Sequence, residues 1–174
     1  PKQAQWYIIG QKDEGLRAKH IEPPHGDLYT KTMVRIYEAY EQTCERGGLV
    51  DFAELLLRAH ELWLHSPDTL LHYQQRFKTI LVDEFQDTNA IQYAWLRVLA
   101  GTSVPVVAVG DDDQSIYGWR GAKIENIQRF SDDFSGGSII RLEQNYRSTQ
   151  TILSAANGLI PNNFGRLGKD LWTA

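Results

Sequence analysis

Residues 80–87 read Ile-Leu-Val-Asp-Glu-Phe-Gln-Asp, an apolar run that ends abruptly in two adjacent carboxylates. A short continuous apolar run is typical of a buried strand in a parallel sheet. Ligands of open α/β sheets bind just beyond the carboxyl ends of such strands. We therefore expect Asp83 and Glu84 at the rim of a sheet, where one carboxylate can lie near Mg²⁺ and the other can polarise a water molecule.

A second apolar run, at residues 104–109, also leads into acids, because Asp111, Asp112 and Asp113 follow it directly after a glycine. Pro105 is compatible with a strand there, since proline is tolerated at the first residues of a strand. The carboxyl ends of parallel strands point the same way, so both acidic clusters are expected at one edge of the sheet.

Helical periodicity and capping residues surround these two strands. From Lys31 the apolar residues fall on one helical face up to Gly47 and Gly48. Asp51 and Glu54 have the spacing of a capping box at the start of the next helix, which Pro67 ends. Residues 1–30 predict a short helix or strand followed by a loop.

Further elements are predicted along the rest of the chain. Asn89 and Gln92 have capping-box spacing for a helix that Gly101 closes, and Ser148 is the expected cap of a last helix that Pro161 ends. We also predict helices at 70–77 and 123–130 and a third strand at 138–142. Helices that alternate with apolar strands indicate the α/β class, with a mostly parallel sheet covered by helices on both faces.

Composition restricts the class of protein. The 174 residues are 42% hydrophobic and 23% charged with a net charge of −4, which is ordinary for a soluble globular protein. This charge argues against a wholly basic nucleic-acid coat protein, but it leaves room for an enzyme with a local basic groove. Cys44 is the only cysteine, which fits a reducing cytoplasmic location. The apolar runs are too short to span a membrane.

Three long motifs occur in order: DEFQD at 83–87, VGDDDQSIYGWRGA at 109–122 and RLEQNYRST at 141–149. They resemble three successive motifs of bacterial superfamily 1 DNA helicases of the UvrD/PcrA/Rep type. Residues 49–56 and 153–157 also resemble that family, so the resemblance covers essentially the whole chain. It implies a partial RecA-like fold of the P-loop NTPase class, with ATP and Mg²⁺ as cofactors.

The resemblance assigns roles at the nucleotide. Asp83 matches the ligand of Mg²⁺ in MgATP, and Glu84 matches the base that activates the attacking water. Gln114 matches the glutamine that senses the γ-phosphate, a task that suits an amide because it both donates and accepts hydrogen bonds. From the residues alone, Gln114 can equally be a loop glutamine with local hydrogen bonds.

Tyr146 and Arg147 complete the nucleotide roles that the resemblance implies. Tyr146 matches the residue that packs on adenine. Arg147 matches an arginine finger, whose planar and permanently charged guanidinium stabilises the transferring phosphate. The alternative for Arg147 is an arginine at a helix end in a salt bridge.

Tyr117 and Trp119 match aromatic residues on which bases of single-stranded DNA stack. Such stacking tolerates any sequence and contributes about 1–3 kcal/mol per base. The alternative is that both rings belong to the core. The flanking glycines and Arg120 make an apolar setting less suitable, so the DNA role is favoured for Trp119 and left open for Tyr117.

One motif of this fold does not occur in the 174 residues: a phosphate loop of the form G-x-x-x-x-G-K-[ST]. The resemblance therefore implies an internal slice: 1–30 the tail of a helical insertion subdomain, 31–143 the latter part of the first RecA-like motor domain, and 144–174 the start of the second. Without the phosphate-loop strand the sheet is incomplete. We expect negligible ATPase activity from the isolated chain, and self-association through exposed strand edges.

Three functions are compatible with these sequence features. The first is part of an ATP-dependent 3′–5′ DNA helicase of repair or replication, acting on single-stranded and duplex-junction DNA. The second is a non-enzymatic fragment that binds single-stranded DNA or a protein partner through Tyr117 and Trp119. The third is a nuclease that uses the acidic clusters as a two-metal site.

Overall fold

The two predicted strands pair in parallel. The computed structural model describes residues 1–134 and 136–174. In it β1 (Ile80–Val82) lies beside β2 (Val106–Ala108), with Ile80 opposite Val106 and Val82 opposite Ala108. β1 spans the apolar run that precedes Asp83, whereas β2 is shorter than the apolar run at 104–109 that predicted it. This mixed helix and sheet arrangement confirms the α/β class at the level of a small two-stranded parallel sheet.

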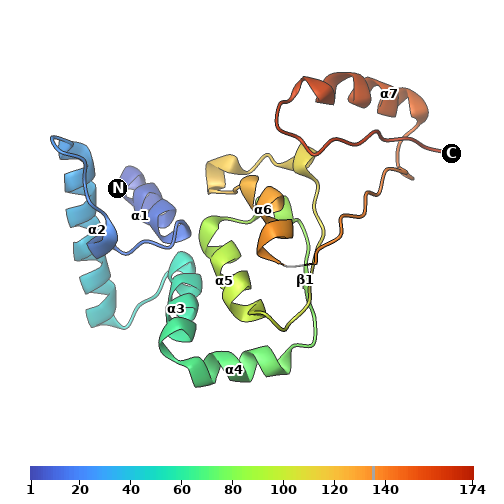
Figure 1. The fold of residues 1–174 in the computed structure, drawn as a ribbon. Helices are drawn as coiled ribbons and strands as arrows, with labels where there is room; N and C mark the ends of the chain where they lie inside the picture. The colour runs from blue at the N-terminus through green and yellow to red at the C-terminus, as the bar shows by residue number, and fades with distance from the viewer. Residues whose placement is uncertain (135) are drawn as a thin grey trace.

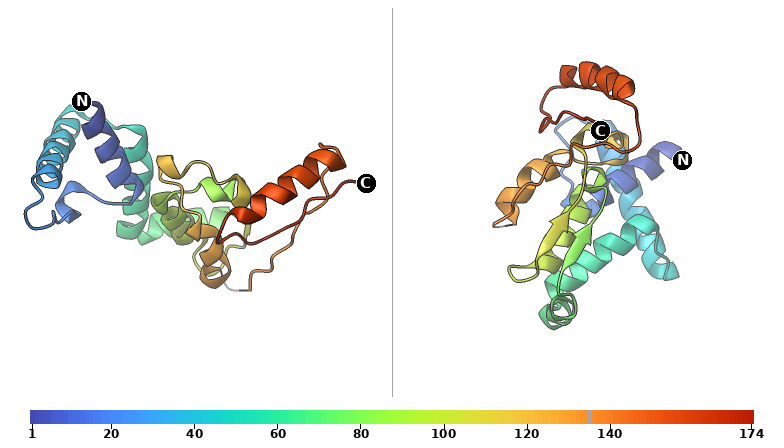
Figure 2. Two further views of the ribbon diagram at one scale, coloured as in Figure 1. Left: turned by 90° about the horizontal axis from the view of Figure 1, so that it is seen from above. Right: turned by 90° about the vertical axis from the view of Figure 1, so that its right-hand side faces the viewer.

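The described residues also form α-helices. The helices are α1 (Lys2–Asp13), α2 (Leu28–Gly47), α3 (Phe52–His65), α4 (Pro67–Arg76), α5 (Ala90–Ala100), α6 (Glu125–Asp133) and α7 (Gln150–Leu159). Of these, α5 and α6 pack on the sheet. Figure 1 shows α1 and α2 at one end of the molecule, the sheet with α5 and α6 in the middle, and α7 at the other end. Figure 2 shows that the molecule is elongated along this direction.

Only one face of the sheet is covered by the described residues. Side chains alternate between faces along a strand. One face packs against Phe85, residues of α5 and residues of α6, in a cluster that contains Ile80, Val82, Tyr93, Leu96, Val106, Ala108, Ile127 and Phe130. On the other face Leu81 and Val107 are 77% and 48% exposed. The prediction that helices cover both faces is therefore wrong here, because α5 and α6 pack on the same side.

Capping residues set the helix starts. The carboxylate of Asp27 accepts hydrogen bonds from the backbone N–H and hydroxyl of Thr30, so α2 begins at Leu28 rather than at Lys31. Asp51 caps α3 as predicted and accepts from the backbone N–H of Glu54 at 2.8 Å. The Glu54 side chain does not complete a capping box, because its carboxylate binds cations instead.

The caps of the later helices are partly as predicted. Asn89 and Gln92 form the predicted reciprocal capping box of α5. Pro67 ends α3 and also opens α4, where the first helical position suits proline. The predicted cap of α7, Ser148, is replaced by Thr149, and neither caps it with a side chain. The helix ends at Leu159, and Pro161 lies in the 3-10 turn that follows.

The predicted third strand at 138–142 does not form. These residues have no regular structure, and Ile139, Ile140 and Leu142 are 64%, 81% and 80% exposed. A strand needs a hydrogen-bonding edge beside it, and this segment leads away from the sheet toward α7 (Figure 1). A single parallel bridge between Gln144 and Trp172 ties it to the C-terminal segment instead. Among the described helices, none is long and apolar enough to cross a membrane.

Candidate functional site at the acidic edge of the sheet

The two acidic clusters meet at one edge, as expected. Backbone hydrogen bonds continue past the strand ends: Val109 N donates to Val82 O at 2.8 Å, and Phe85 N donates to Val109 O at 2.9 Å. The residues that follow β1 and β2 are therefore held side by side. We call residues 83–87 and 110–114 the acidic edge.

Asp83 and Glu84 are both exposed at this edge. Glu84 has φ of 50°, the one positive φ of a non-glycine residue in the described parts of the chain. A left-handed backbone at such a residue costs on the order of 1 kcal/mol or more, and such strain clusters at functional sites. Glu84 N donates to Asp83 Oδ1 at 2.9 Å, so the turn brings the two carboxylates to solvent together.

Gln86 joins the two clusters and was not singled out from the sequence. Its side chain is buried, with 1% exposed. Its Nε2 donates to Glu84 Oε2 at 2.8 Å, and its Oε1 accepts from Asp111 N at 3.0 Å. A Cβ at position 110 would lie 2.8 Å from Gln86 Oε1, so this close approach requires Gly110. The sequence feature that could have indicated the role of Gln86 is its place as a polar residue between acids, directly after an apolar strand.

The acids after β2 are held by the segment that follows α7. Arg166 donates to both carboxylate oxygens of Asp113, at 2.9 and 2.7 Å, and Lys169 forms an ion pair with Asp111. The backbone N–H of Leu167 donates to Asp112 Oδ2 at 2.6 Å. The three carboxylates each place an oxygen within 4.8 Å of the others. In this arrangement cations of the chain itself compensate the charges of Asp111 and Asp113.

Gln114 lies on Asp111 and is exposed. Its Nε2 donates to Asp111 Oδ2 at 2.8 Å, which is a local hydrogen bond of the kind left open for it. Burial raises the pKa of the Asp111 carboxyl, but hydrogen bonds from Lys169 and Gln114 outweigh this and leave the pKa below its usual range. Asp111 therefore stays ionised at neutral pH and can orient Gln114.

Tyr117, Trp119 and Arg120 form an exposed aromatic ledge. The two rings are tilted at 56° with their centroids 6.4 Å apart. The Arg120 guanidinium lies 4.9 Å from the Tyr117 centroid and 4.6 Å from the Trp119 centroid, within the range of cation–π attraction. Trp119 is 75% exposed, which contradicts a core role for that ring, and Tyr117 is half-buried.

Tyr146 and Arg147 lie in the segment before α7, and both are exposed. The Tyr146 hydroxyl donates to Gln144 Oε1 at 2.8 Å. Asn145 Oδ1 accepts from the backbone N–H of Arg147 at 2.9 Å. Within residues 1–134 and 136–174 the Arg147 guanidinium makes no ion pair, so the salt-bridge alternative is not observed. The hydrogen bonds of these two residues do not bring them to the acidic edge.

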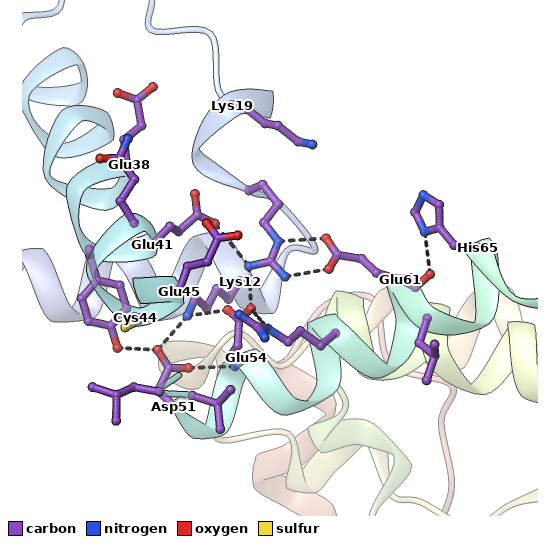
Figure 3. Close-up of a pocket in the computed structure, with 17 residues that line it drawn as sticks. Lys12, Lys19, Glu38, Glu41, Cys44, Glu45, Asp51, Glu54, Glu61 and His65 are labelled. Atoms are coloured by element: carbon purple, nitrogen blue, oxygen red, sulfur yellow. Dashed lines mark hydrogen bonds and ion pairs between the residues drawn. The ribbon is translucent and has the colours of Figure 1, made fainter. Parts of the chain in front are cut away.

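A separate charged cluster joins the N-terminal helices. Lys12, which is 2% exposed, lies 2.7 Å from Asp51 and 2.8 Å from Glu54, and Arg17 contacts Glu54 and Glu61 at 2.7 and 2.6 Å. Figure 3 shows Lys12, Asp51, Glu54 and Glu61 converging in a pocket of about 840 Å³ between α1, α2 and α3, which Arg17 also lines. Matched charges at these distances indicate a structural ion network that lies apart from the acidic edge.

Comparisons with known proteins agree with the motifs. The family described as UvrD/REP helicase N-terminal domain matches residues 1–135. The chain is 67% identical to DNA helicase II of Escherichia coli (strain K12) and 61% identical to that of Haemophilus influenzae, over 99% of this chain and 24% of each relative. It is 45% identical to the ATP-dependent DNA helicase PcrA of Staphylococcus epidermidis over 96% of this chain and 23% of that protein.

The chain thus spans about a quarter of the length of the curated relatives it matches. The matched region includes the first two motifs in full, and the relatives extend the match over the third. The resemblance drawn from the three motifs is confirmed, and the chain belongs to the UvrD/REP helicase family.

Proposed function

We propose that this chain supplies the nucleotide-hydrolysing edge and the DNA-stacking ledge of an ATP-dependent 3′–5′ DNA helicase of the bacterial cytoplasm. The observation that carries the proposal is the continuous link Glu84–Gln86–Asp111–Gln114, which leads within three residues to the exposed aromatic ledge. A motor must couple the nucleotide to the DNA, and this link is a physical route between the two proposed sites.

The acidic edge has the donor set that a magnesium nucleotide needs. Asp83 offers exposed carboxylate oxygens, the ligands that Mg²⁺ prefers. When bound, Mg²⁺ neutralises phosphate charge during transfer. Glu84 serves as the base for the attacking water, and the Gln86 amide holds its carboxylate in place. Gln114 senses the γ-phosphate with its second amide N–H, while the first stays bonded to Asp111 Oδ2.

Tyr146 and Arg147 serve the same nucleotide from the segment that opens the second motor domain. Their exposure leaves the Tyr146 ring free for stacking on adenine and the Arg147 guanidinium free for phosphate. In this proposal residues 1–30 end a helical insertion subdomain, 31–143 belong to the first motor domain and 144–174 begin the second. Closure of the two motor domains would bring both residues to the acidic edge.

The ledge suits single-stranded DNA and a duplex junction. Trp119 exposes a large flat ring beside a cation, and stacking on aromatic faces accepts any base. The same feature favours the second candidate, a non-enzymatic fragment that binds single-stranded DNA. The nuclease is disfavoured because Arg166 and Lys169 already occupy the Asp113 and Asp111 carboxylates that a two-metal site would use.

The test is Glu84→Gln in the whole protein that contains this chain. We expect DNA-stimulated ATP hydrolysis to fall by at least about a hundredfold, the scale of a lost general base, with DNA binding retained. Glu22→Gln, at an exposed glutamate outside the acidic edge, is the control. Unchanged hydrolysis in Glu84→Gln would overturn the assignment. DNA binding without any hydrolysis by the wild type would select the second candidate.

A further inference from the structure

Asp111 contacts several other residues at the acidic edge. Its backbone N–H donates to Gln86, its Oδ2 accepts from Gln114, and its Oδ1 is paired with Lys169. Asp111 therefore connects the glutamine that binds Glu84, the glutamine proposed to sense phosphate, and a cation from the far side of α7. Figure 1 shows the segment after α7 passing back beside the segment that follows β2.

Arg166 forms a second contact between the same two segments, beside the Lys169–Asp111 ion pair. Its guanidinium forms a two-pronged bond to Asp113, a geometry with more directional specificity than a single ion pair, and only 17% of its side chain is exposed. It also donates to Lys169 O at 3.2 Å, which ties the two cations into one short loop. Three clustered carboxylates repel one another, and these cations offset the repulsion within the residue 111–114 turn.

We propose that Arg166 and Lys169 are positioning residues that hold the Asp111–Asp113 turn, and through Asp111 the Gln114 amide, in the conformation required for hydrolysis. The proposal rests on the proposed helicase function for its activity readout. Because the two cations lie beyond α7, in the segment assigned to the second motor domain, their contact makes the conformation of Gln114 depend on how the two domains are docked.

The activity test compares Lys169→Met and Arg166→Gln in the whole protein with Lys31→Met, an exposed lysine of α2 without an ion pair in the described parts of the chain. We expect kcat for DNA-stimulated ATP hydrolysis to fall roughly tenfold in both variants, with KM for ATP within about twofold of the wild type, as for a coupled residue that does not touch the substrate. Lys169→Arg, which keeps the charge, should restore most of kcat.

A second readout does not depend on hydrolysis. In the same whole protein, amide hydrogen exchange of residues 111–120 should become faster in Lys169→Met and Arg166→Gln, and should not change in Lys31→Met. Unchanged exchange there overturns the positioning role. If kcat is unchanged in Lys169→Met and Arg166→Gln while the wild type is active, the positioning role has no effect on catalysis. A loss of kcat in Lys169→Arg as large as in Lys169→Met would show that the positive charge is not what matters. If the wild type itself does not hydrolyse ATP, the helicase proposal fails, while the exchange experiment still decides whether the two cations order the turn.

Discussion

The structure of the acidic edge depends on the close approach of the Gly110 backbone to the Gln86 side chain. The backbone of one strand end lies against the side-chain amide of the other, with no room for a Cβ. The contact satisfies a buried amide on both its donor and its acceptor side, which is the condition for burying a polar group at little cost. A short-range packing constraint thus sets the position of a proposed catalytic carboxylate.

Gly110→Ala should disturb this edge. The added methyl group would displace Gln86, at a cost of about 1–3 kcal/mol typical of overpacking. Hydrogen exchange at residues 83–87 and 110–114 should become faster. Gly10→Ala is the matched control, because a Cβ there meets nothing within 4 Å. If exchange at the acidic edge stays unchanged in Gly110→Ala, the close contact does not hold the edge.

Trp119→Ala should weaken binding of fluorescent single-stranded DNA to this chain by about 1–3 kcal/mol, the value of one stacked base. The loss should be similar for different base sequences, since every base has a stacking face. Trp6→Ala is the control, because Trp6 is also exposed, at 69%, but lies on α1. Equal effects of the two substitutions, measured by anisotropy over a range of salt concentrations, would contradict a specific ledge.

At the scale of elements, the caps of α3 and α5 were predictable and the ion pairs were not. Asp51 and Asn89 were identified from spacing alone, since a cap depends on residues three positions apart. Glu54 had the correct spacing for a capping box, yet its carboxylate binds Lys12, Arg17 and Arg58. Two of these partners come from segments about forty residues away, so only tertiary packing could select them.

The N-terminal helices should lose stability in acid. Burial raises the pKa of the Glu54 carboxyl, but the hydrogen bonds from Lys12, Arg58 and Arg17 outweigh burial, so the pKa lies below its usual value. The pKa values of Asp51 and Glu61 are also lowered. A carboxyl whose pKa is lower in the folded state stabilises it above the unfolded pKa, about 4, and loses that contribution as the pH falls through the folded value.

Helicity measured by circular dichroism should therefore hold from neutral pH to about pH 5 and decline below about pH 4. Glu54→Gln removes one of these carboxyls, so its stability at neutral pH should be lower and its acid dependence shallower. Glu22→Gln, at an exposed glutamate with no ion pair in the described ranges, should follow the wild-type curve. An identical acid profile in Glu54→Gln would show that the ion network does not control this stability.

At the scale of the whole molecule, the uncovered sheet face is the dominant feature. Leu81, Val107 and Val109 are exposed by 77%, 48% and 55%, beside a strand edge without a partner in the described residues. Exposed apolar area and open edges both favour association. This face is where the predicted α/β architecture is incomplete.

The isolated chain should self-associate or stay loosely packed around β1 and β2. Leu81→Lys should reduce association by placing a charge on the open face, whereas Leu28→Lys, at an equally exposed leucine of α2, should not. Light scattering and thermal unfolding provide the measurements. A compact wild-type monomer with a cooperative transition would count against this prediction.

The amino-acid sequence alone determined the two parallel strands, the caps of α3 and α5 and the meeting of two acidic clusters, because each follows from spacing over a few residues. The family followed from the resemblance of three long motifs. The sequence also placed Trp119 outside the core because glycines and a cation flank that ring. Only the tertiary structure decided that one sheet face is open, that 138–142 is not a strand, and that Gln86, Arg166 and Lys169 hold the acidic edge. Those features depend on which distant segments supply a hydrogen-bonding edge, an apolar cover or a countercharge, and local patterns carry no information about that choice.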